Sequence, residues 1–487
     1  MNKEENKTET TRDVLSGFFH IGFGTAINMI IGFFTTPIIT RIVDPEEYGR
    51  FSIFTMYISI AIMVLCFGLD QTLVRYYYKK KSIEYKRWLI SNCSIFPILF
   101  SIAFVVGFSS VVSIFDLPFE YADCVWLLSI GVVGHLLYRF ATIVLRLENK
   151  NKLYSGVYVA NKVIYIVMAF ALVLFTDWNR FYCLAISTVA AFLSAALFAL
   201  LMSRDKWKLS LTGTFEEIKR KELVIYGLPF IVSMGLTTLF QSIDKFSLNH
   251  FCDYATVGIY TSAMTIVNVF AIIQTTFNTM WAPMMVKHYE QAPEDRKFYA
   301  KANAFITVIM FAFGLTLVLC KDVFGMLLGA KYRAAAYIVP FLALEPIMLT
   351  ISETTVVGIV VKNKSYMNIV VSLVACATNF TGNTVLVPLI GPRGAAISTG
   401  LSYIVFFVMR TIIGARYYTV NFGLKRFALI SIAMIEFATI CAFSKFSLWT
   451  VGAYIMCIFV LFLLYRDSVK SLWHIVVNTL SRKKARA

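Results

Sequence analysis

Long apolar runs recur along the whole of this chain, and they constrain its fold more than any other feature. A helix needs about 17–25 residues to cross a bilayer, and each run reaches that length. Helices are expected because lipid offers backbone groups no hydrogen-bond partner, and the runs lack the alternation of outer-membrane barrel strands. The sequence therefore predicts an all-α polytopic membrane protein of about fourteen spans. The predicted spans cover roughly residues 14–37, 51–69, 90–114, 123–145, 153–175, 181–202, 223–249, 256–283, 302–320, 335–360, 367–389, 394–415, 427–443 and 447–465.

Composition supports this fold class. Only 15% of the 487 residues are charged and 58% are hydrophobic, whereas soluble proteins carry about 25% charged residues. The nine Cys residues follow no CxxC or His/Cys spacing, so we expect neither a metal site nor a disulfide framework. The segment Met1–Arg12 is polar and the first apolar run exceeds a signal-peptide core, so we expect a first span and not a cleaved leader.

The basic residues predict the orientation of the chain in the membrane. With the N-terminus in the cytoplasm, 33 of the 45 Lys and Arg residues fall in cytoplasmic segments and 8 in outside loops. Cytoplasmic loops of membrane proteins carry such an excess, so both termini are predicted to be cytoplasmic. The formal net charge of +17 then needs no nucleic acid to explain it, because anionic lipid headgroups attract basic segments at that surface.

Two short motifs occur twice along the chain. The pattern Lys-Asn-Lys-x-Tyr at 150–154 recurs at 362–366, and Asp-x4-Gly-x-aromatic at 44–51 recurs at 253–260. Six predicted spans separate the copies in each pair, so both copies face the same side of the membrane. The pattern predicts a duplicated chain with two six-helix halves of the same orientation, a plan of transporters that bind substrate between the halves.

The predicted domains follow from this repeat. They are an N-terminal six-helix lobe (14–203), a basic cytoplasmic linker (204–222), a C-terminal six-helix lobe (223–416), two additional transmembrane helices (427–466) and a basic amphipathic cytoplasmic tail (467–487). The tail combines an apolar stripe with a basic cluster, which is typical of a helix that lies at an anionic membrane surface.

Four segments carry a resemblance to a known family. They are RIVDPEEYGRFSIF at 41–54, FGLDQTLVRYYYKK at 67–80, YGLPFIVSMGLTTLFQSIDKFSLNHFCDYATVGIYTSAM at 226–264 and LLGAKYRAAAYIVPFLAL at 327–344. In order and spacing they resemble the bacterial O-antigen and capsular repeat-unit flippases, often called Wzx, over roughly residues 14–465. That family belongs to the multidrug/oligosaccharidyl-lipid/polysaccharide exporter (MOP) superfamily, with the multidrug extruders and the lipid II flippase.

The resemblance implies a fold and an activity. The fold would be a V-shaped pair of six-helix lobes around a central cavity. The activity would move an undecaprenyl-pyrophosphate-linked oligosaccharide from the inner to the outer leaflet by alternating access, for cell-surface polysaccharide synthesis.

Basic residues inside the predicted spans of the first half form the main candidate site. A basic side chain at mid-bilayer costs roughly 2.5–3.5 kcal/mol on insertion scales, and such residues usually face a cavity or a partner. Arg139 and Lys162 lie deepest. We expect no acid at comparable depth, because Asp70 and Asp123 fall at span ends. Unbalanced positive charge suits an anionic ligand, so we predict that these cations bind the substrate headgroup.

Five further residues complete the candidate substrate site. Arg75 and Arg146 lie near cytoplasmic span ends, where arginine also simply snorkels to the interface. His20 and His135 lie in spans one and four, where they either bind sugar or titrate, or are satisfied by a neighbouring carbonyl. Lys245 lies in span seven and is the only basic candidate in the second half.

Carboxylates inside spans of the second half are candidates for a coupling-ion site. Asp244 lies in span seven, and Glu345 and Glu353 lie in span ten, where two prolines bracket Glu345. Proline frees carbonyls that only a cavity or a neighbour satisfies, so a carboxylate there suits a Na⁺ or proton site. The alternative is structural, in which Glu345, Glu353 or Glu436 pairs with Lys245 or Arg410.

Three function classes follow from these features. The first is the lipid-linked oligosaccharide flippase of the bacterial inner membrane, with no catalytic residue, no metal and no cofactor beyond a coupling Na⁺ or H⁺. Its expected partners are the lipid-linked substrate, membrane lipids and polysaccharide polymerase or assembly proteins, and the protein is expected to be a monomer that binds no nucleic acid.

The other two classes explain less of the sequence. A Na⁺- or H⁺-coupled multidrug extruder would use Glu345 and Glu353, but Arg139 and Lys162 argue against a cavity for cationic drugs. A membrane polymerase or ligase acting on the same lipid usually carries a large outer loop, and every predicted outside loop is short.

Overall fold

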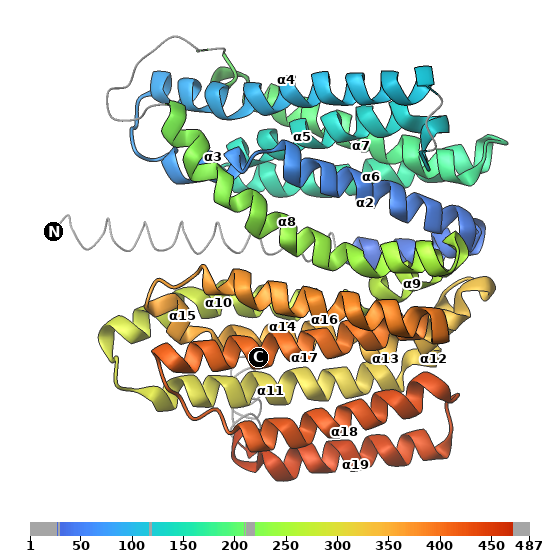
Figure 1. The fold of residues 1–487 in the computed structure, drawn as a ribbon, viewed down its shortest axis with the longest axis vertical. Coiled ribbons are helices and arrows are strands. Elements are labelled where there is room, and N and C mark those ends of the chain that lie inside the picture. The colour runs from blue at the N-terminus through green and yellow to red at the C-terminus, as the bar shows by residue number, and fades with distance from the viewer. Residues whose placement is uncertain (1–26, 28–29, 116–118, 209, 211–219, 471–487) are drawn as a thin grey trace, which may run out of the picture. The chain divides into compact units, whose positions relative to one another are not determined.

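The described part of this computed structural model is helical throughout its regular elements (Figure 1). The structure describes residues 27, 30–115, 119–208, 210 and 220–470. Within them ten helices are long and apolar enough to span a membrane, and two more spans are helix pairs bent by 48° and 51°. Two shorter apolar helices, Ile30–Ile42 and Leu448–Leu464, complete the set. The predicted all-α, polytopic fold class is confirmed.

Internal contacts divide the chain into two compact units. Unit 1 comprises Met1–Thr35 and Ile42–Ser242, and unit 2 comprises Thr36–Arg41 and Ile243–Ala487. The boundary near the middle of the chain lies inside the helix α8 (Arg220–Phe251), so that one continuous helix contributes to both units. Much of the predicted linker 204–222 and most of the predicted tail lie outside the described residues.

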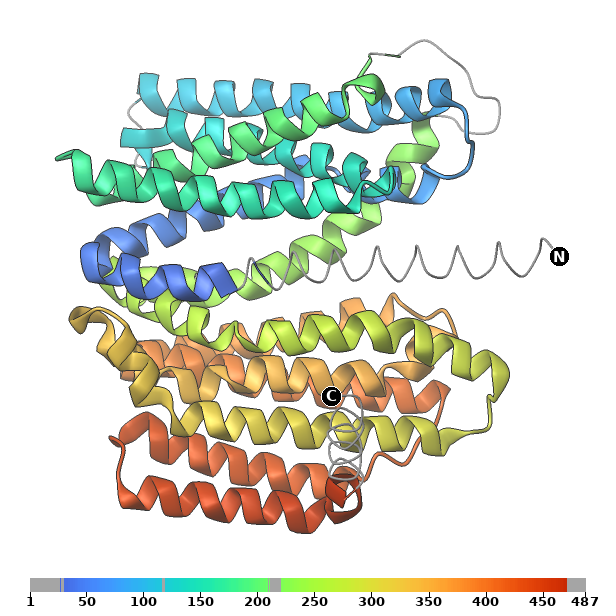
Figure 2. The same cartoon turned by 180° about the vertical axis from the view of Figure 1, so that it is seen from behind.

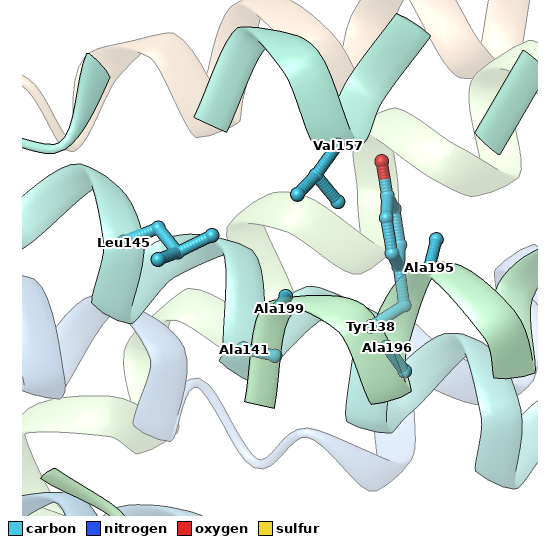
Figure 3. Close-up of a cluster of buried hydrophobic side chains, with 7 residues drawn as sticks. All are labelled: Tyr138, Ala141, Leu145, Val157, Ala195, Ala196 and Ala199. Atoms are coloured by element: carbon cyan, nitrogen blue, oxygen red, sulfur yellow. The ribbon is translucent and has the colours of Figure 1, made fainter. Parts of the chain in front are cut away.

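Unit 1 is built around the packing of α5 and α6 against α7. Its elements before α8 are α2 (Pro45–Leu65), α3 (Leu69–Tyr76), α4 (Ile83–Phe115), η1 (Ala122–Cys124), α5 (Val125–Leu147), α6 (Asn151–Phe175), α7 (Arg180–Met202) and η2 (Arg204–Lys206). Small side chains on α7, including Ala195, Ala196 and Ala199, receive Val157 of α6 and Tyr138 of α5 in one buried cluster (Figure 3). Alanines let the helices approach closely and leave room for aromatic rings beside them.

The chain turns sharply between α2 and α3 through two residues with left-handed backbone. Phe67 has φ 52° and Gly68 has φ 65°. Gly68 lies so close to α8 that a Cβ atom on it would come within 2.1 Å of the Gly227 carbonyl oxygen. Thr72 of α3 also donates a hydrogen bond to the Leu223 carbonyl, at 3.0 Å. Glycine at position 68 therefore allows both the turn and the close contact with α8.

A charged cluster holds the segments at one end of unit 1 together. The Glu148 carboxylate, just after α5, accepts hydrogen bonds from the Tyr77 hydroxyl at 2.6 Å and Lys86 Nζ at 2.7 Å, and it lies 2.8 Å from Lys206 Nζ. Burial alone would raise the pKa of this carboxyl group, but these donors outweigh it and lower the pKa to about 2. The cluster joins α4, η2 and the segment after α3 to the end of α5.

Unit 2 contains the bent spans and two additional helices. Its elements after α8 are α9 (Tyr254–Val267), α10 (Phe270–Gln291), α11 (Arg296–Leu319), α12 (Lys321–Leu327), η3 (Ala330–Tyr337), α13 (Val339–Leu342), α14 (Leu344–Thr355), α15 (Val357–Val361), α16 (Met367–Ile390), α17 (Pro392–Tyr417), α18 (Leu424–Phe443) and α19 (Leu448–Leu464). The helices α18 and α19 lie beside α11 in both views (Figures 1 and 2). Thr316 of α11 and Tyr454 of α19 share a hydrogen bond. The Phe446 amide, between α18 and α19, donates a hydrogen bond to Asp322 of α12.

Candidate functional site

Lys162 lies on α6, and no acidic residue that the structure describes pairs with it. Its side chain is half-buried, and its Nζ lies 5.2 Å from the centroid of the Tyr165 ring. A Cβ atom placed on Gly32 would lie 3.8 Å from Lys162 Cε, so this side chain passes beside the helix Ile30–Ile42. No described carboxylate forms an ion pair or hydrogen bond with it. A cation in this position inside an apolar span needs water or an anion.

Arg139 is not an unbalanced cation, which corrects the expectation from the sequence. Its Nη2 and Nε lie 2.5 Å and 3.1 Å from one carboxylate oxygen of Asp70. The side chain of Asp70 is only 1% exposed and that of Arg139 is 23% exposed. Asp70 was predicted to lie at a span end, but the turn at Phe67–Gly68 places the start of α3 inside unit 1, next to α5. The pair is neutral overall.

The remaining predicted residues of unit 1 lie in different surroundings. The His135 ring stacks on Phe192 with centroids 4.1 Å apart, and its buried Nδ1 has no hydrogen-bond partner among the described residues. Arg75 and Arg146 are exposed near the ends of α3 and α5, so binding and snorkelling remain alternatives for both. His20 lies outside the described residues.

Asp244 is the centre of a buried polar cluster in unit 2. Its residue exposure is 5%, and its carboxylate accepts four hydrogen bonds from neutral donors on α9, α16 and α17. The donors are the Tyr260 hydroxyl at 2.5 Å, the Asn379 amide at 3.2 Å, the Asn383 amide at 2.7 Å and the Thr399 hydroxyl at 2.6 Å. The adjacent Lys245 makes no ion pair or hydrogen bond to any described side chain.

The cluster around Asp244 contains carboxylate, amide and hydroxyl oxygens. The buried Asn383 Oδ1 has no hydrogen-bond partner among the described residues. Rotating an asparagine amide exchanges its oxygen and nitrogen atoms, and such orientations are assigned from the hydrogen-bond network. Carboxylate, amide and hydroxyl oxygens together are the ligands that hard cations prefer. Around Asp244 these oxygens could coordinate a metal ion in place of the present hydrogen bonds, or the carboxylate could exchange a proton.

The two predicted glutamates of span ten lie in different environments. Glu345 lies in the first turn of α14, within the second part of the bent pair Ala330–Tyr337 and Val339–Thr355. It is hydrogen-bonded to Tyr403 and lies close enough to Asp244 to interact with it electrostatically. Glu353 instead forms an ion pair with Arg410 at 2.7 Å, and Arg410 also donates to Ser352 at 2.7 Å. Glu353 therefore takes the structural arrangement that the sequence analysis kept as the alternative.

Sequence reasoning missed the neutral members of the Asp244 cluster. Asn379 and Asn383 are four residues apart on α16, and Asn383 donates to Asn379 Oδ1 at 3.0 Å. Two amides spaced by one helical turn in an apolar span signal a buried polar site, because residues four apart share a helix face. Thr399 carries no such signal, since threonine hydroxyls in spans commonly bond to their own helix, and Tyr260 is one of 25 tyrosines in the chain.

Comparisons with known proteins agree with the fold. The lipid II flippase MurJ in an inward closed conformation matches with a TM-score of 0.67 and 11% identity, over 94% of this chain and 99% of the other. An inward-facing multidrug resistance MATE family transporter of the MOP superfamily matches with a TM-score of 0.60 and 15% identity, over 81% of this chain and 94% of the other. No curated protein sequence matches the chain.

A family profile matches more than half of the chain. It matches residues 38–337, which include α2 to η3 and therefore both Lys162 and Asp244. Its description is polysaccharide biosynthesis protein. With its all-helical fold shared with MOP superfamily transporters, this chain belongs to the polysaccharide biosynthesis protein family.

Proposed function

We propose that the protein is a flippase that moves undecaprenyl-pyrophosphate-linked oligosaccharide repeat units from the inner to the outer leaflet of the bacterial cytoplasmic membrane. The observation that carries the proposal is Lys162, a cation in a membrane span with no carboxylate partner among the described residues. Membership of a polysaccharide biosynthesis family and a fold like that of the lipid II flippase MurJ support the same reading.

In this proposal unit 1 binds the diphosphate headgroup. Lys162 supplies a full positive charge, and the ion pair with Asp70 holds Arg139 in a fixed orientation on α5. A diphosphate entering beside them would replace water around Lys162 and stabilise the cation in a low-dielectric setting. The polyprenyl tail stays in lipid, because transferring a long apolar chain into a wet passage would be costly.

Unit 2 binds the coupling cation in this proposal. Asp244, the two asparagines and Thr399 offer oxygen ligands, and Glu345 adds a second acid nearby. A Na⁺ or a proton would offset the buried negative charge of the cluster. Either ion would shift the equilibrium between two states of the transporter. The size of the shift is set by the difference between the ion's affinities for the two states.

The proposal also covers the membrane topology, oligomeric state and partners of the protein. Both termini lie in the cytoplasm, as the distribution of Lys and Arg indicates. The protein acts as a monomer beside polysaccharide polymerase and assembly proteins, and it is a transporter with no catalytic residue. Alternating access carries the headgroup between the two sides.

A Na⁺- or H⁺-coupled multidrug extruder is the second candidate. The acidic cluster around Asp244 and the likeness to a MATE family transporter favour it. Its cargo would be cationic, and an unneutralised Lys162 in the passage would repel that cargo. Drug-resistance assays with cells that lack or overproduce the protein separate the two candidates.

The test is a flipping assay in proteoliposomes that contain the lipid-linked oligosaccharide. We expect Lys162→Ala to slow flipping at least tenfold, whereas Lys162→Arg keeps the charge and much of the rate. The control is Lys152→Ala, which removes an exposed cation from the same helix and leaves the rate unchanged. A wild-type rate in the Lys162→Ala protein would refute the proposed role of the cation.

A further inference from the structure

Four polar side chains form a stripe along one face of α6. They are Tyr154, Tyr158, Asn161 and Tyr165, here called the α6 stripe. At about 100° per residue they lie within about 60° of one another around the helix, and at about 1.5 Å per residue they extend over about 16 Å. All four side chains are half-buried. The stripe is therefore partly open along roughly half of a membrane span.

The rings of the α6 stripe are held by neighbouring aromatic and small side chains. Tyr154 and Tyr158 stack with centroids 6.0 Å apart and 29° between their planes, and both pack on the buried cluster of Figure 3. The ring centroid of Tyr138 on α5 lies 6.4 Å from that of Tyr158. Tyr165 stacks on Phe51 at 6.2 Å with 7° between the planes. These contacts fix the ring orientations before any ligand binds.

The polar tips of the stripe have no hydrogen-bond partner in the described part of the chain. Within the described residues the hydroxyls of Tyr154, Tyr158 and Tyr165 make no hydrogen bond, and the buried Asn161 Nδ2 makes none either. Elsewhere in unit 1 the hydroxyls of Tyr76, Tyr138 and Tyr226 also make no hydrogen bond to a described residue, whereas six other tyrosine hydroxyls each donate one. These belong to Tyr57, Tyr77, Tyr78, Tyr85, Tyr121 and Tyr182.

Polar groups without partners are costly inside a membrane span. An unsatisfied buried donor or acceptor costs about 1–3 kcal/mol, and lipid supplies no partner. Asn161 Nδ2 is a donor of this kind, and the three phenol hydroxyls on the same face, which are not fully buried, also have no described partner. This face therefore suits a polar occupant. An acyl or polyprenyl chain would cover the rings but leave every hydroxyl and the amide unsatisfied, so the chemistry of the stripe excludes it as the main ligand.

We propose that the α6 stripe binds the saccharide part of the substrate. Sugars present C–H faces that pack on aromatic rings and hydroxyls that exchange hydrogen bonds with phenols and amides, and the stripe offers both. The proposal rests on the proposed function, because it makes the stripe a continuation of the diphosphate site. Lys162 follows Asn161 directly and lies over the Tyr165 ring, and Arg139 is within electrostatic reach of Tyr158.

The stripe would then act in specificity. Diphosphate binding by Lys162 does not distinguish one glycan from another, whereas hydroxyl and amide partners at set spacing do. His135, whose buried Nδ1 also has no partner among the described residues, lies near Tyr138 with ring centroids 6.1 Å apart and extends the surface onto α5.

Binding of three probes to the full-length protein in detergent tests the inference. The probes are undecaprenyl diphosphate, the lipid-linked oligosaccharide extracted from cells that make the protein's own glycan, and that oligosaccharide released from its lipid. We expect the wild type to bind the second probe about tenfold more tightly than the first, a difference of about 1.4 kcal/mol. The double variant Tyr154→Phe/Tyr158→Phe, which keeps both rings, should lose most of this preference and bind the first probe as before.

The controls separate the failure of this inference from the failure of the proposed function. Lys162→Ala should weaken the first two probes by the same factor, and Tyr366→Phe, on an exposed residue of unit 2, should change nothing. If the tyrosine variants keep the full preference, or weaken the first two probes equally, the stripe does not bind sugar. If the wild type fails to bind undecaprenyl diphosphate but binds the free oligosaccharide in a manner that depends on Tyr154 and Tyr158, the stripe stands and the diphosphate proposal falls. If the wild type binds none of the three probes, both the saccharide proposal and the diphosphate proposal are wrong.

Discussion

Asp70 and Arg139 form an ion pair inside unit 1, with Nη2 and Oδ2 2.5 Å apart. Asp70 lies in the first turn of α3, two residues after Gly68 of the left-handed turn, and Arg139 lies near the middle of α5. The pair therefore links the turn to the helix that carries the candidate substrate site. Its geometry makes Asp70 a positioning residue for Arg139 and leaves Lys162 as a half-buried cation of unit 1 without an acidic partner among the described residues.

Removing the acid from this pair should destabilise unit 1. Asp70→Ala leaves a mostly buried guanidinium without its counter-ion, and breaking a buried pair costs about 3–5 kcal/mol. We expect a clear fall in the thermal unfolding midpoint in detergent, whereas Arg75→Ala, at an exposed site on the same helix, should have little effect. The double variant Asp70→Ala/Arg139→Ala should recover part of the loss. Additive losses in that cycle would mean that the two residues do not interact.

The Asp244 cluster predicts stabilisation by the coupling cation. A ligand that binds the folded state stabilises it by RT ln(1 + [L]/Kd), so the thermal midpoint of the wild type should rise with Na⁺ when choline is the replacement ion, or with falling pH if the ion is H⁺. Asp244→Asn should abolish that rise. Glu436→Gln, at an exposed carboxylate on α18, is the matched control. An equal rise in the Asp244→Asn protein would place the coupling site elsewhere.

The surroundings of Glu148 predict that the stability of unit 1 depends on pH in the acidic range. Its pKa is lowered from the ordinary 4.5 to about 2 in the folded protein, because hydrogen bonds from Lys206, Lys86 and Tyr77 outweigh burial. A lowered folded-state pKa contributes stability that is fully present above about pH 4.5 and is lost as the pH falls toward about 2. Glu148→Gln should therefore lower the unfolding midpoint at pH 7, and the difference from wild type should shrink between about pH 4.5 and about pH 2.

The control for this titration is Glu84→Gln, at an exposed residue on α4. It should leave both the midpoint at pH 7 and its dependence on pH as in the wild type. A pH-independent difference between Glu148→Gln and wild type would show that the carboxylate charge is not the cause.

Gly68 predicts a strong effect of adding one methyl group. Gly68→Ala places a Cβ atom 2.1 Å from the Gly227 carbonyl oxygen and also forces alanine into a left-handed backbone. We expect a loss of folded protein in size-exclusion profiles and a lower unfolding midpoint. Gly156→Ala, on α6 with nothing within 4 Å of the added atom, should instead stabilise by about 0.5–1 kcal/mol through helix propensity. Similar behaviour of the two variants would contradict the close contact between the turn and α8.

Some of the candidate site could be predicted from local sequence alone. Lys162 stands out because a lysine in an apolar run is costly wherever the helix packs, and Glu345 stands out because two prolines bracket it. The ion-pair partners of Arg139 and Glu353 could not be predicted from local sequence. Each has an oppositely charged partner 69 or 57 residues away in the chain, and no local pattern specifies which distant side chain a cation or an acid will meet.

The sequence by itself determined that this protein is a chain of membrane-spanning helices, because the cost of exposing apolar residues to water and backbone groups to lipid acts on each run separately. Tertiary structure alone decided which charges are neutralised. A left-handed turn placed Asp70 against Arg139, and the packing of α8, α9, α16 and α17 gathered four neutral donors around Asp244. Pairing of buried polar groups depends on distances of a few ångströms between segments far apart in sequence, and only the packed helices set those distances.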